Sequence, residues 1–256
     1  MKRKWILSSI ALVVGTGFLI WIVFSFGFRP RPNVLVITMD TTRADHLSCY
    51  GYQKIKTPFI DAVAKEGVLF EEAFSVQPVT LPSHCSIFTG KYPFHHGVRD
   101  NNIYRLSKAN LTLAEILKEH GYITAAFVSS YILDHQFGLN QGFQLYNDRF
   151  LKPKKRGRLP VDRRAVEVSI LASKWLQINR KTLKKNSFFL WLHYYDPHAD
   201  YDPPPPYREV YPGSPYDGEI AYMDDWIGYF FRELKLSLIH ISEPTRPLYR
   251  SYAVFC

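Results

Sequence analysis

Short apolar runs alternate with segments of helical periodicity between residues 32 and 235. The run NVLVIT, residues 33–38, is continuously apolar and of strand length, which is typical of a buried strand in a parallel sheet. Further segments favour strands at residues 68–74 (VLFEEAF), 124–130 (TAAFVSS) and 187–195 (SFFLWLHYY). The pattern therefore predicts strands spread along the chain and separated by other elements.

Helix start and stop signals fall between these strands. Thr57 is placed as a cap, with Pro58 at the first helical position and Gly67 at the end. Thr112 and Glu115 have capping-box spacing. Two more helices are expected over residues 161–178 and 216–234. Strands that alternate with helices predict an α/β fold with a mostly parallel sheet and helices on both faces.

The amino-terminal segment has the character of a membrane anchor. Lys2, Arg3 and Lys4 precede an uncharged apolar run from Trp5 to Phe28, long enough to cross a bilayer core of about 30 Å. A cleavable secretory signal is the alternative, but no small-residue cleavage site follows the run. We expect residues 1–31 to form a single uncleaved transmembrane helix, with the remainder on the extracytoplasmic side.

The carboxyl-terminal segment differs in character from the rest. LSLIHISEPTR, residues 236–246, and the final SYAVFC each resemble translated sequencing-adapter DNA. We therefore expect residues 236–256 to be an artefact and leave them out of the fold prediction, the alternative being an unusual natural terminus. Residues 32–235 then form one domain, which we expect to continue in the natural protein.

Charge and cysteine content narrow the function classes. The formal net charge is +9, but much of it lies beside the apolar run and in one basic segment, residues 151–164. That segment has no interleaved aromatic residues, which disfavours nucleic-acid binding and leaves a solvated loop, or attraction to anionic lipid or substrate. Three cysteines do not make a disulfide scaffold, so stability must come from a core, which 46% hydrophobic residues can supply.

Several polar residues follow predicted strands. Asp40 comes after the first strand, Thr80 follows the segment 68–74, and Asp196 and His198 follow the strand at 187–195. In a parallel sheet the ligand crevice lies outside the carboxyl ends of the strands, so these residues are expected along one rim. Taken singly, each is more often an ordinary polar loop residue.

Three motifs taken together resemble a known family. PNVLVITMDTTRADHLSCYGY, TLPSHCSIFTGKYPFHHGV and FFLWLHYYDPHADYDPP, in this order, look like the amino-terminal half of the catalytic domain of the sulfatases and related members of the alkaline phosphatase superfamily. The resemblance covers about Asn33 to Leu234. It implies an alkaline-phosphatase-like fold, truncated here, and the transmembrane helix predicted from the apolar run precedes it.

The resemblance implies roles for two residues. The aspartate after the first strand binds metal in that family, and this position is Asp40. The nucleophile lies two residues before the Pro-Ser pair, which places Thr80 there. Family sulfatases carry cysteine or serine at that position and oxidise it to formylglycine. Threonine cannot form that aldehyde because its β-carbon bears a methyl group, so formylglycine is not expected.

Other positions depart from the sulfatase pattern. His84 stands where an arginine usually follows Pro-Ser, which leaves a titratable group for substrate binding. His198 matches a histidine that contacts sulfate, whereas in the phosphodiesterase branch the corresponding loop supplies metal ligands, which Asp196 could join. The alternative for Asp196 is a rigid turn in the proline-rich loop. His193 is interpreted as a hydrogen-bonded core histidine.

The remaining interpretations are structural. Arg43 and Asp45 are expected to form a local ion pair. Cys85 is expected to be a small packing residue rather than a reactive thiol. His95 and His96 are treated as structural.

The sequence thus favours a membrane-tethered, metal-dependent hydrolase of anionic esters. Asp40, Thr80 and Asp196 would hold divalent ions, zinc ahead of calcium or manganese, and Thr80 would attack phosphorus in a phosphodiester or phosphomonoester. The alternatives are a sulfuric ester hydrolase, an envelope phospho-headgroup transferase, and a non-catalytic binding domain that keeps the fold. Further metal ligands are expected in a carboxyl-terminal half that lies outside this sequence.

Overall fold

The computed structural model describes residues 31–150, 162–239 and 253–254. All but the last residue of the predicted transmembrane helix, residues 1–31, and most of the basic segment 151–164 lie outside the described residues. No helix among the described residues is both long enough and apolar enough to cross a bilayer.

The central sheet contains four parallel strands in the order β1-β5-β3-β4. Their bounds are Val34–Met39 (β1), Phe188–Tyr194 (β5), Ile123–Phe127 (β3) and Leu145–Asn147 (β4). The predicted strands at 33–38 and 187–195 are therefore confirmed, and the strand predicted at 124–130 is present but ends at Phe127. The three-residue strand β4 is too short to show periodicity, so the sequence pattern does not predict it.

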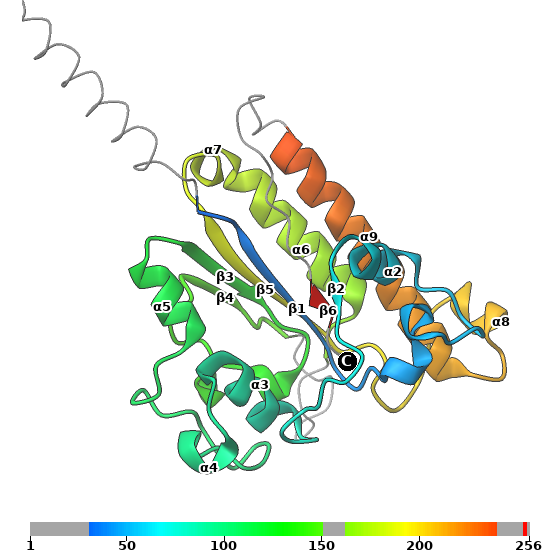
Figure 1. Ribbon diagram of the computed structural model, residues 1–256, viewed down its shortest axis with the longest axis horizontal. Coiled ribbons are helices and arrows are strands. Elements are labelled where there is room, and N and C mark those ends of the chain that lie inside the picture. Colours follow the sequence, from blue (N-terminus) through cyan, green and yellow to red (C-terminus); the bar gives the residue numbers. More distant parts are fainter. Residues whose placement is uncertain (1–30, 151–161, 240–252, 255–256) are drawn as a thin grey trace, which may run out of the picture. The chain divides into compact units, whose positions relative to one another are not determined.

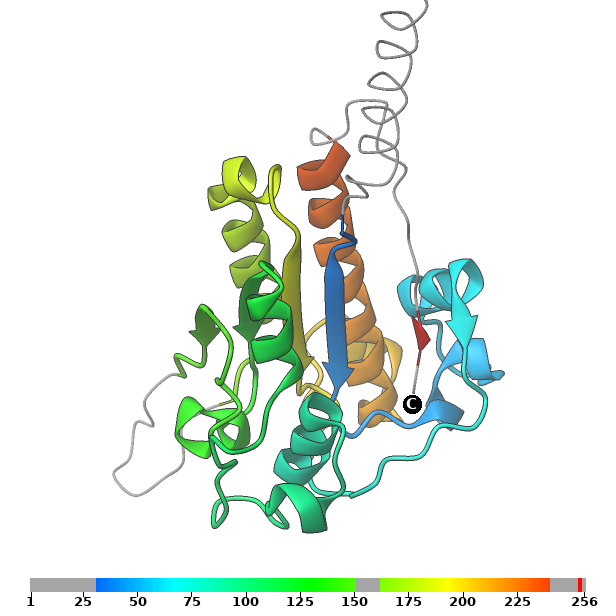
Figure 2. The same ribbon diagram turned by 60° about the vertical axis from the view of Figure 1, so that its left-hand side comes forward.

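Helices cover both faces of this sheet (Figure 1). Their bounds are Pro58–Glu66 (α2), Thr80–Thr89 (α3), Pro93–His96 (α4), Leu113–Glu119 (α5), Ala165–Ile178 (α6), Arg180–Leu183 (α7), Tyr207–Val210 (α8) and Pro215–Ile239 (α9). Short 3-10 helices lie at Ala44–His46, Ser48–Tyr50, Tyr131–Leu133 and His135–Phe137. In both ribbon views α6 and α9 run beside β1 and β5, and Figure 2 shows the arrowhead of β1 pointing toward α3.

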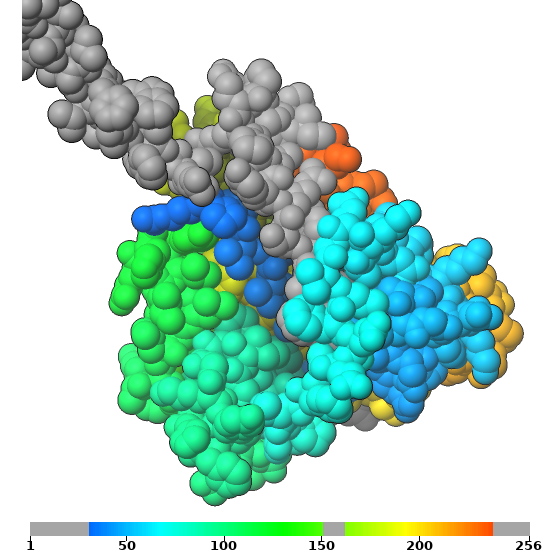
Figure 3. All heavy atoms as spheres, in the orientation of Figure 1, coloured from blue at the N-terminus to red at the C-terminus, as the bar shows by residue number. Residues whose placement is uncertain are grey.

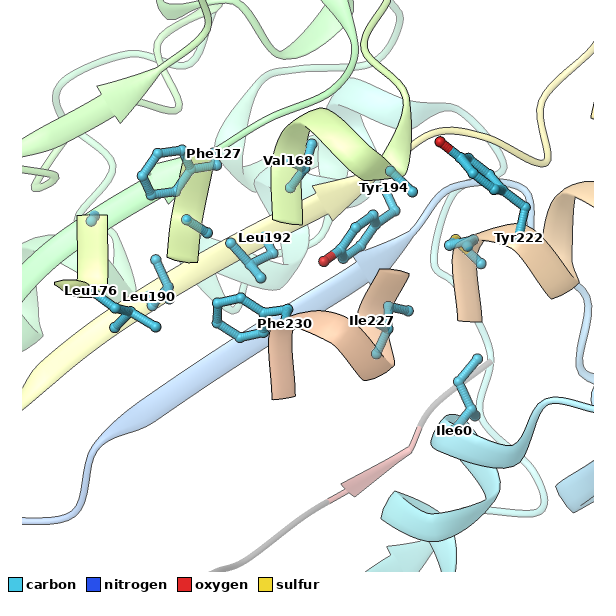
Figure 4. Packing of buried hydrophobic residues seen from close by; sticks show 14 of the residues in the cluster. Ile60, Phe127, Val168, Leu176, Leu190, Leu192, Tyr194, Tyr222, Ile227 and Phe230 are labelled. Carbon is cyan, nitrogen blue, oxygen red and sulfur yellow. The ribbon is translucent and has the colours of Figure 1, made fainter. Parts of the chain in front are cut away.

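Alternate side chains of the strands pack into two separate hydrophobic cores, one on each face of the sheet. Leu190, Leu192 and Tyr194 of β5 pack against α6 and α9, and Figure 4 shows them facing Val168 and Phe230. Phe189 and Trp191, the intervening residues, pack on the other face with buried residues of α3 and α5. Because both faces are covered, every residue of β5 is buried, which is why its sequence is apolar apart from His193.

The predicted strand at residues 68–74 is wrong in extent and in place. Only Val68–Leu69 forms a strand, β2, and it pairs with Ala253–Val254 (β6) outside the central sheet. The rest of the segment is irregular, and Phe70 and Phe74 are exposed. Glu71 and Glu72 interrupt the apolar pattern, and a strand that buries neither face gains little from its apolar residues.

Helix capping follows the predicted signals in most details. Thr112 Oγ1 accepts from the Glu115 N–H and Glu115 accepts from the Thr112 N–H, so the capping box of α5 is present. Pro58 starts α2 as predicted. The Thr57 side chain does not cap α2 through a backbone bond, and instead donates to the Asp61 carboxylate at 3.0 Å.

Candidate active site

Asp40 lies where β1 ends, at the carboxyl edge of the sheet. Its backbone N–H donates to Tyr194 O at 2.9 Å and so extends the β1–β5 pairing by one residue. The next residue, Thr41, has φ +51°, a left-handed conformation that is uncommon for threonine. Two hydrogen bonds hold it there, from Thr41 Oγ1 to Pro197 O (2.5 Å) and from the Tyr216 hydroxyl to Thr41 O (2.7 Å). The chain therefore turns sharply just after Asp40, and the turn is fixed.

Thr80 is the first residue of α3 and faces Asp40. Its Oγ1 donates to Asp40 Oδ2 at 3.1 Å. The next backbone N–H, of Leu81, donates to Asn101 Oδ1 at 2.9 Å, so a loop side chain satisfies part of the helix terminus. The structure thus brings together the two residues expected to be nucleophile and metal ligand. Because α3 presents Thr80, the wrong prediction for the strand at 68–74 does not displace it.

His193, interpreted from the sequence as a core histidine, lies at the same site. Its side chain is fully buried on β5, and Nε2 is 3.3 Å from Asp40 Oδ2. The signal for this contact is the parallel register, which pairs His193 with Thr38, two residues before Asp40. Sequence alone does not give that register.

His84 follows Thr80 by one helical turn on α3. Its Nδ1 is 2.8 Å from Thr80 O, a carbonyl that can only accept, so Nδ1 carries the proton. Burial, together with the neighbouring His193, lowers the pKa of His84 to about 4. The expected titratable cation is therefore a neutral imidazole at neutral pH. Its Nε2 is buried with no hydrogen-bond partner in the described part of the chain.

Asp40 is held as a carboxylate. Burial on its own raises its pKa, but hydrogen bonding to His193, the nearby His84 and the Thr80 hydroxyl act in the opposite direction, and the net pKa lies below the ordinary value. A buried anion that keeps its charge, beside a hydroxyl and an orphaned imidazole nitrogen, is a donor set that fits a divalent cation.

Asp196 and His198 take other contacts. Asp196 Oδ1 accepts from the Ala165 N–H at 3.1 Å at the start of α6, and Oδ2 has no partner among the described residues. The His198 ring stacks on Tyr195 with centroids 4.3 Å apart, and Nδ1 is 2.8 Å from Ala199 O. None of these contacts is to Asp40 or Thr80, so the roles of Asp196 in metal binding and of His198 in substrate binding stay predictions.

Three side chains of types that can ligate a metal lie close together at a second place in the fold. Within the described residues, ligand atoms of Asp134, His135 and Asp148 lie within 4.8 Å of one another. These groups already bond locally: Asp148 Oδ2 lies 2.6 Å from His135 Nδ1 and accepts the His135 N–H at 2.7 Å. Asp134 Oδ1 accepts from the Gln136 N–H. The cluster organises its own loop.

Three structural expectations hold. Arg43 and Asp45 form an exposed ion pair at 2.6 Å. Cys85, a residue of α3, is fully buried in the core that this helix covers. His96 is buried and accepts from the Val98 N–H at 3.1 Å, as a structural residue of its loop.

The space-filling view shows the surface around β1. A hollow lies between the cyan and the green parts of the chain, with blue atoms of the β1 region at its floor (Figure 3). The carboxyl edge of the parallel sheet carries the Asp40 carboxylate, the Thr80 hydroxyl and the buried imidazoles of His84 and His193.

Comparison with known proteins assigns the family. The sulfatase family model matches residues 32–238, and the chain therefore belongs to the sulfatase family. It is 24% identical over 207 residues to an N-acetylglucosamine-6-O-sulfatase of Bacteroides thetaiotaomicron, covering 77% of this chain and 36% of that protein. It is 44% identical over 95 residues to a ulvan-active sulfatase of Formosa agariphila, covering 37% of this chain and 18% of that protein.

A solved structure shows the same fold. The phosphonate monoester hydrolase of Agrobacterium radiobacter superposes with a TM-score of 0.65 at 20% identity, covering 83% of this chain and 60% of that one. At this identity the likeness concerns the fold alone. The chain spans little more than a third, at most, of the two curated relatives named above.

Proposed function

We propose that this chain supplies the nucleophile and one metal ligand to a metal-dependent hydrolase of anionic esters. The observation that carries the proposal is the 3.1 Å hydrogen bond from Thr80 Oγ1 to Asp40 Oδ2 at the carboxyl edge of the sheet. This is the edge at which parallel α/β sheets bind ligands. The family to which the chain belongs gives the proposal its reaction class.

The chain's own residues suit an anionic ester. Thr80 stands at the amino end of α3, a helix of 10 residues, where backbone N–H groups and the helix dipole favour negative charge. A divalent ion held by Asp40 would lower the pKa of a bound hydroxyl and offset charge on the transferred group. Thr80 Oγ1 attacks the central atom, the alcohol leaves, and water then cleaves the ester formed on Thr80.

Sulfuric esters are the substrate class that the comparisons support best. The curated relatives described above are sulfatases by name, one active on ulvan and one on 6-O-sulfated N-acetylglucosamine. By this argument the substrate is a sulfate ester of a sugar.

Phosphoric esters are the second candidate, and residue 80 is the observation that favours them. Thr80 cannot become formylglycine, whereas a plain hydroxyl activated by metal is a suitable nucleophile toward phosphorus. The sequence-based preference for phosphorus rests first on this side chain, and the departure from the sulfatase pattern at His84 points the same way.

One experiment tests the nucleophile and the substrate class together. In the intact protein, kcat/KM is measured on sulfate monoesters, phosphate monoesters and phosphate diesters of one chromogenic alcohol, with and without chelator. We expect Thr80→Ala to lower kcat/KM by at least about 1,000-fold, because the substitution removes the oxygen atom that attacks the ester. Thr80→Ser keeps the hydroxyl and is the matched control.

The outcomes separate the hypotheses. Full turnover by Thr80→Ala would exclude Thr80 as nucleophile. Turnover of sulfate esters alone would exclude phosphoric esters as the substrate class. Turnover of phosphate esters alone would exclude sulfuric esters. Activity that survives thorough chelation would contradict the proposal that the hydrolysis depends on a metal ion.

A further inference from the structure

We propose that His193 is a positioning residue of this site. It holds Oδ2 of the Asp40 carboxylate so that Oδ1 is the oxygen presented to a divalent ion. The inference rests on the proposed function, because it assigns a role toward that ion. It concerns a residue that the sequence indicates only as part of the core.

The first observation is the place of His193. It lies on the central strand β5, fully buried, with Nε2 3.3 Å from Asp40 Oδ2. A core histidine is commonly satisfied by backbone groups. This one directs a ring nitrogen at a carboxylate at the ligand-binding edge of the sheet.

The second observation fixes which nitrogen carries the proton. The Ser129 N–H points at His193 Nδ1 over a long hydrogen bond of 3.4 Å, so Nδ1 offers its lone pair. A neutral ring then carries its proton on Nε2 and donates it to Asp40 Oδ2. The Ser129 hydroxyl also donates to His193 O at 2.7 Å, which ties the two segments together.

The third observation is the asymmetry of the carboxylate. The side-chain hydrogen bonds from Thr80 Oγ1 and His193 Nε2 both reach Oδ2, and no described residue donates to Oδ1. The His84 ring stands edge-on to His193 with centroids 5.0 Å apart, which limits rotation of the His193 ring. Carboxylates that bind metals are typically fixed by such hydrogen bonds, and losing one costs about 10- to 100-fold in affinity.

A pair of nearly matched substitutions tests the role. In His193→Gln the amide nitrogen reaches close to the position of Nε2 and can still donate to Asp40. In His193→Asn the amide reaches only the position of Nδ1. Titration calorimetry of the intact protein with Zn²⁺ and with Mn²⁺ gives the dissociation constant of each variant. We expect His193→Asn to bind about 10- to 100-fold more weakly than wild type and His193→Gln to stay within about threefold.

The control is another buried histidine, His96, which bonds to Ser86 and to the Val98 N–H and not to the site. His96→Asn should leave the metal dissociation constant unchanged, whatever it does to stability. Equal affinity of wild type, His193→Asn and His193→Gln would overturn the inference alone. Absence of metal binding in wild type would overturn the proposed function and the inference with it.

A measurement on the wild type keeps the inference testable if His193→Asn does not fold. Two-bond ¹⁵N–¹H correlation spectra distinguish the two neutral tautomers of a histidine ring. We expect the His193 proton on Nε2. A proton on Nδ1 would mean that Nε2 cannot donate to Asp40, and would reject the positioning role.

Discussion

At the scale of single residues, burial makes Cys85 a packing residue and not a reactive thiol. It lies five residues after the candidate nucleophile, on the same helix, and its side chain is fully buried. Burial raises the pKa of its thiol to about 12, so the thiolate is scarce at pH 8. We expect iodoacetamide at pH 8 to leave Cys85 unmodified in the folded protein and to alkylate it in denaturant, measured by peptide mass spectrometry. Rapid labelling of the folded protein would contradict the packing role.

The site residues differ in how far sequence can predict them. Asp40 and Thr80 each belong to a motif with a recognisable neighbourhood, and the structure places their side chains in contact. Sequence assigns His193 to the core because a histidine within an apolar strand looks the same whether its ring meets backbone or carboxylate. Sequence also predicts His84 as a titratable cation, because it does not show the degree of burial that lowers the pKa of His84 to about 4.

At the scale of elements, the contact between α2 and α9 depends on a glycine. A Cβ at Gly228 would lie 2.3 Å from Cγ of Phe59, whose ring also lies under the Arg232 guanidinium at 5.2 Å. Alanine is favoured over glycine in a helix by about 1 kcal/mol, but overpacking costs about 1–3 kcal/mol. We therefore expect Gly228→Ala to lower the free energy of unfolding by about 1 kcal/mol, measured by urea denaturation.

Gly213 supplies the comparison. A Cβ there meets no atom within 4 Å, so Gly213→Ala should be neutral or slightly stabilising. A Gly228→Ala protein as stable as Gly213→Ala would show that α2 and α9 adjust without cost.

Elements are predicted best where local chemistry and packing agree. The capping box at Thr112 and the apolar run of β5 act locally and match the core, so both appear as expected. The strand predicted at 68–74 does not form over its full length, because Val68, Phe70 and Phe74 stay exposed and only Leu69 packs against the core, which only the tertiary structure reveals. β4 is a three-residue strand whose pairing with β3 depends on register and not on its own pattern.

At the scale of the whole molecule, buried carboxylates set the dependence of stability on pH. Asp196, Glu219 and Asp224 are each almost fully buried, and burial raises the pKa of each to about 7. A carboxyl group whose pKa is raised in the folded state stabilises the fold below its unfolded pKa. That contribution is lost as the pH rises through the folded pKa. His84 acts in the opposite direction, because burial lowers its pKa to about 4 and its contribution is lost on acidification.

Asp196 isolates the carboxylate effect, because Asp196→Asn removes the charge and keeps an amide oxygen to accept the Ala165 N–H. The wild-type Asp196 pKa moves from 3.8 to about 7 on folding, so its share of stability is lost between about pH 4 and pH 7. We expect the unfolding free energy of wild type, from urea denaturation, to fall more steeply over that range than that of Asp196→Asn. The gap should be on the order of 2 kcal/mol, since each tenfold change in the acid dissociation constant corresponds to about 1.4 kcal/mol and structural relaxation reduces the total. Parallel curves for the two proteins would mean that Asp196 ionises in the folded protein as it does in the unfolded chain.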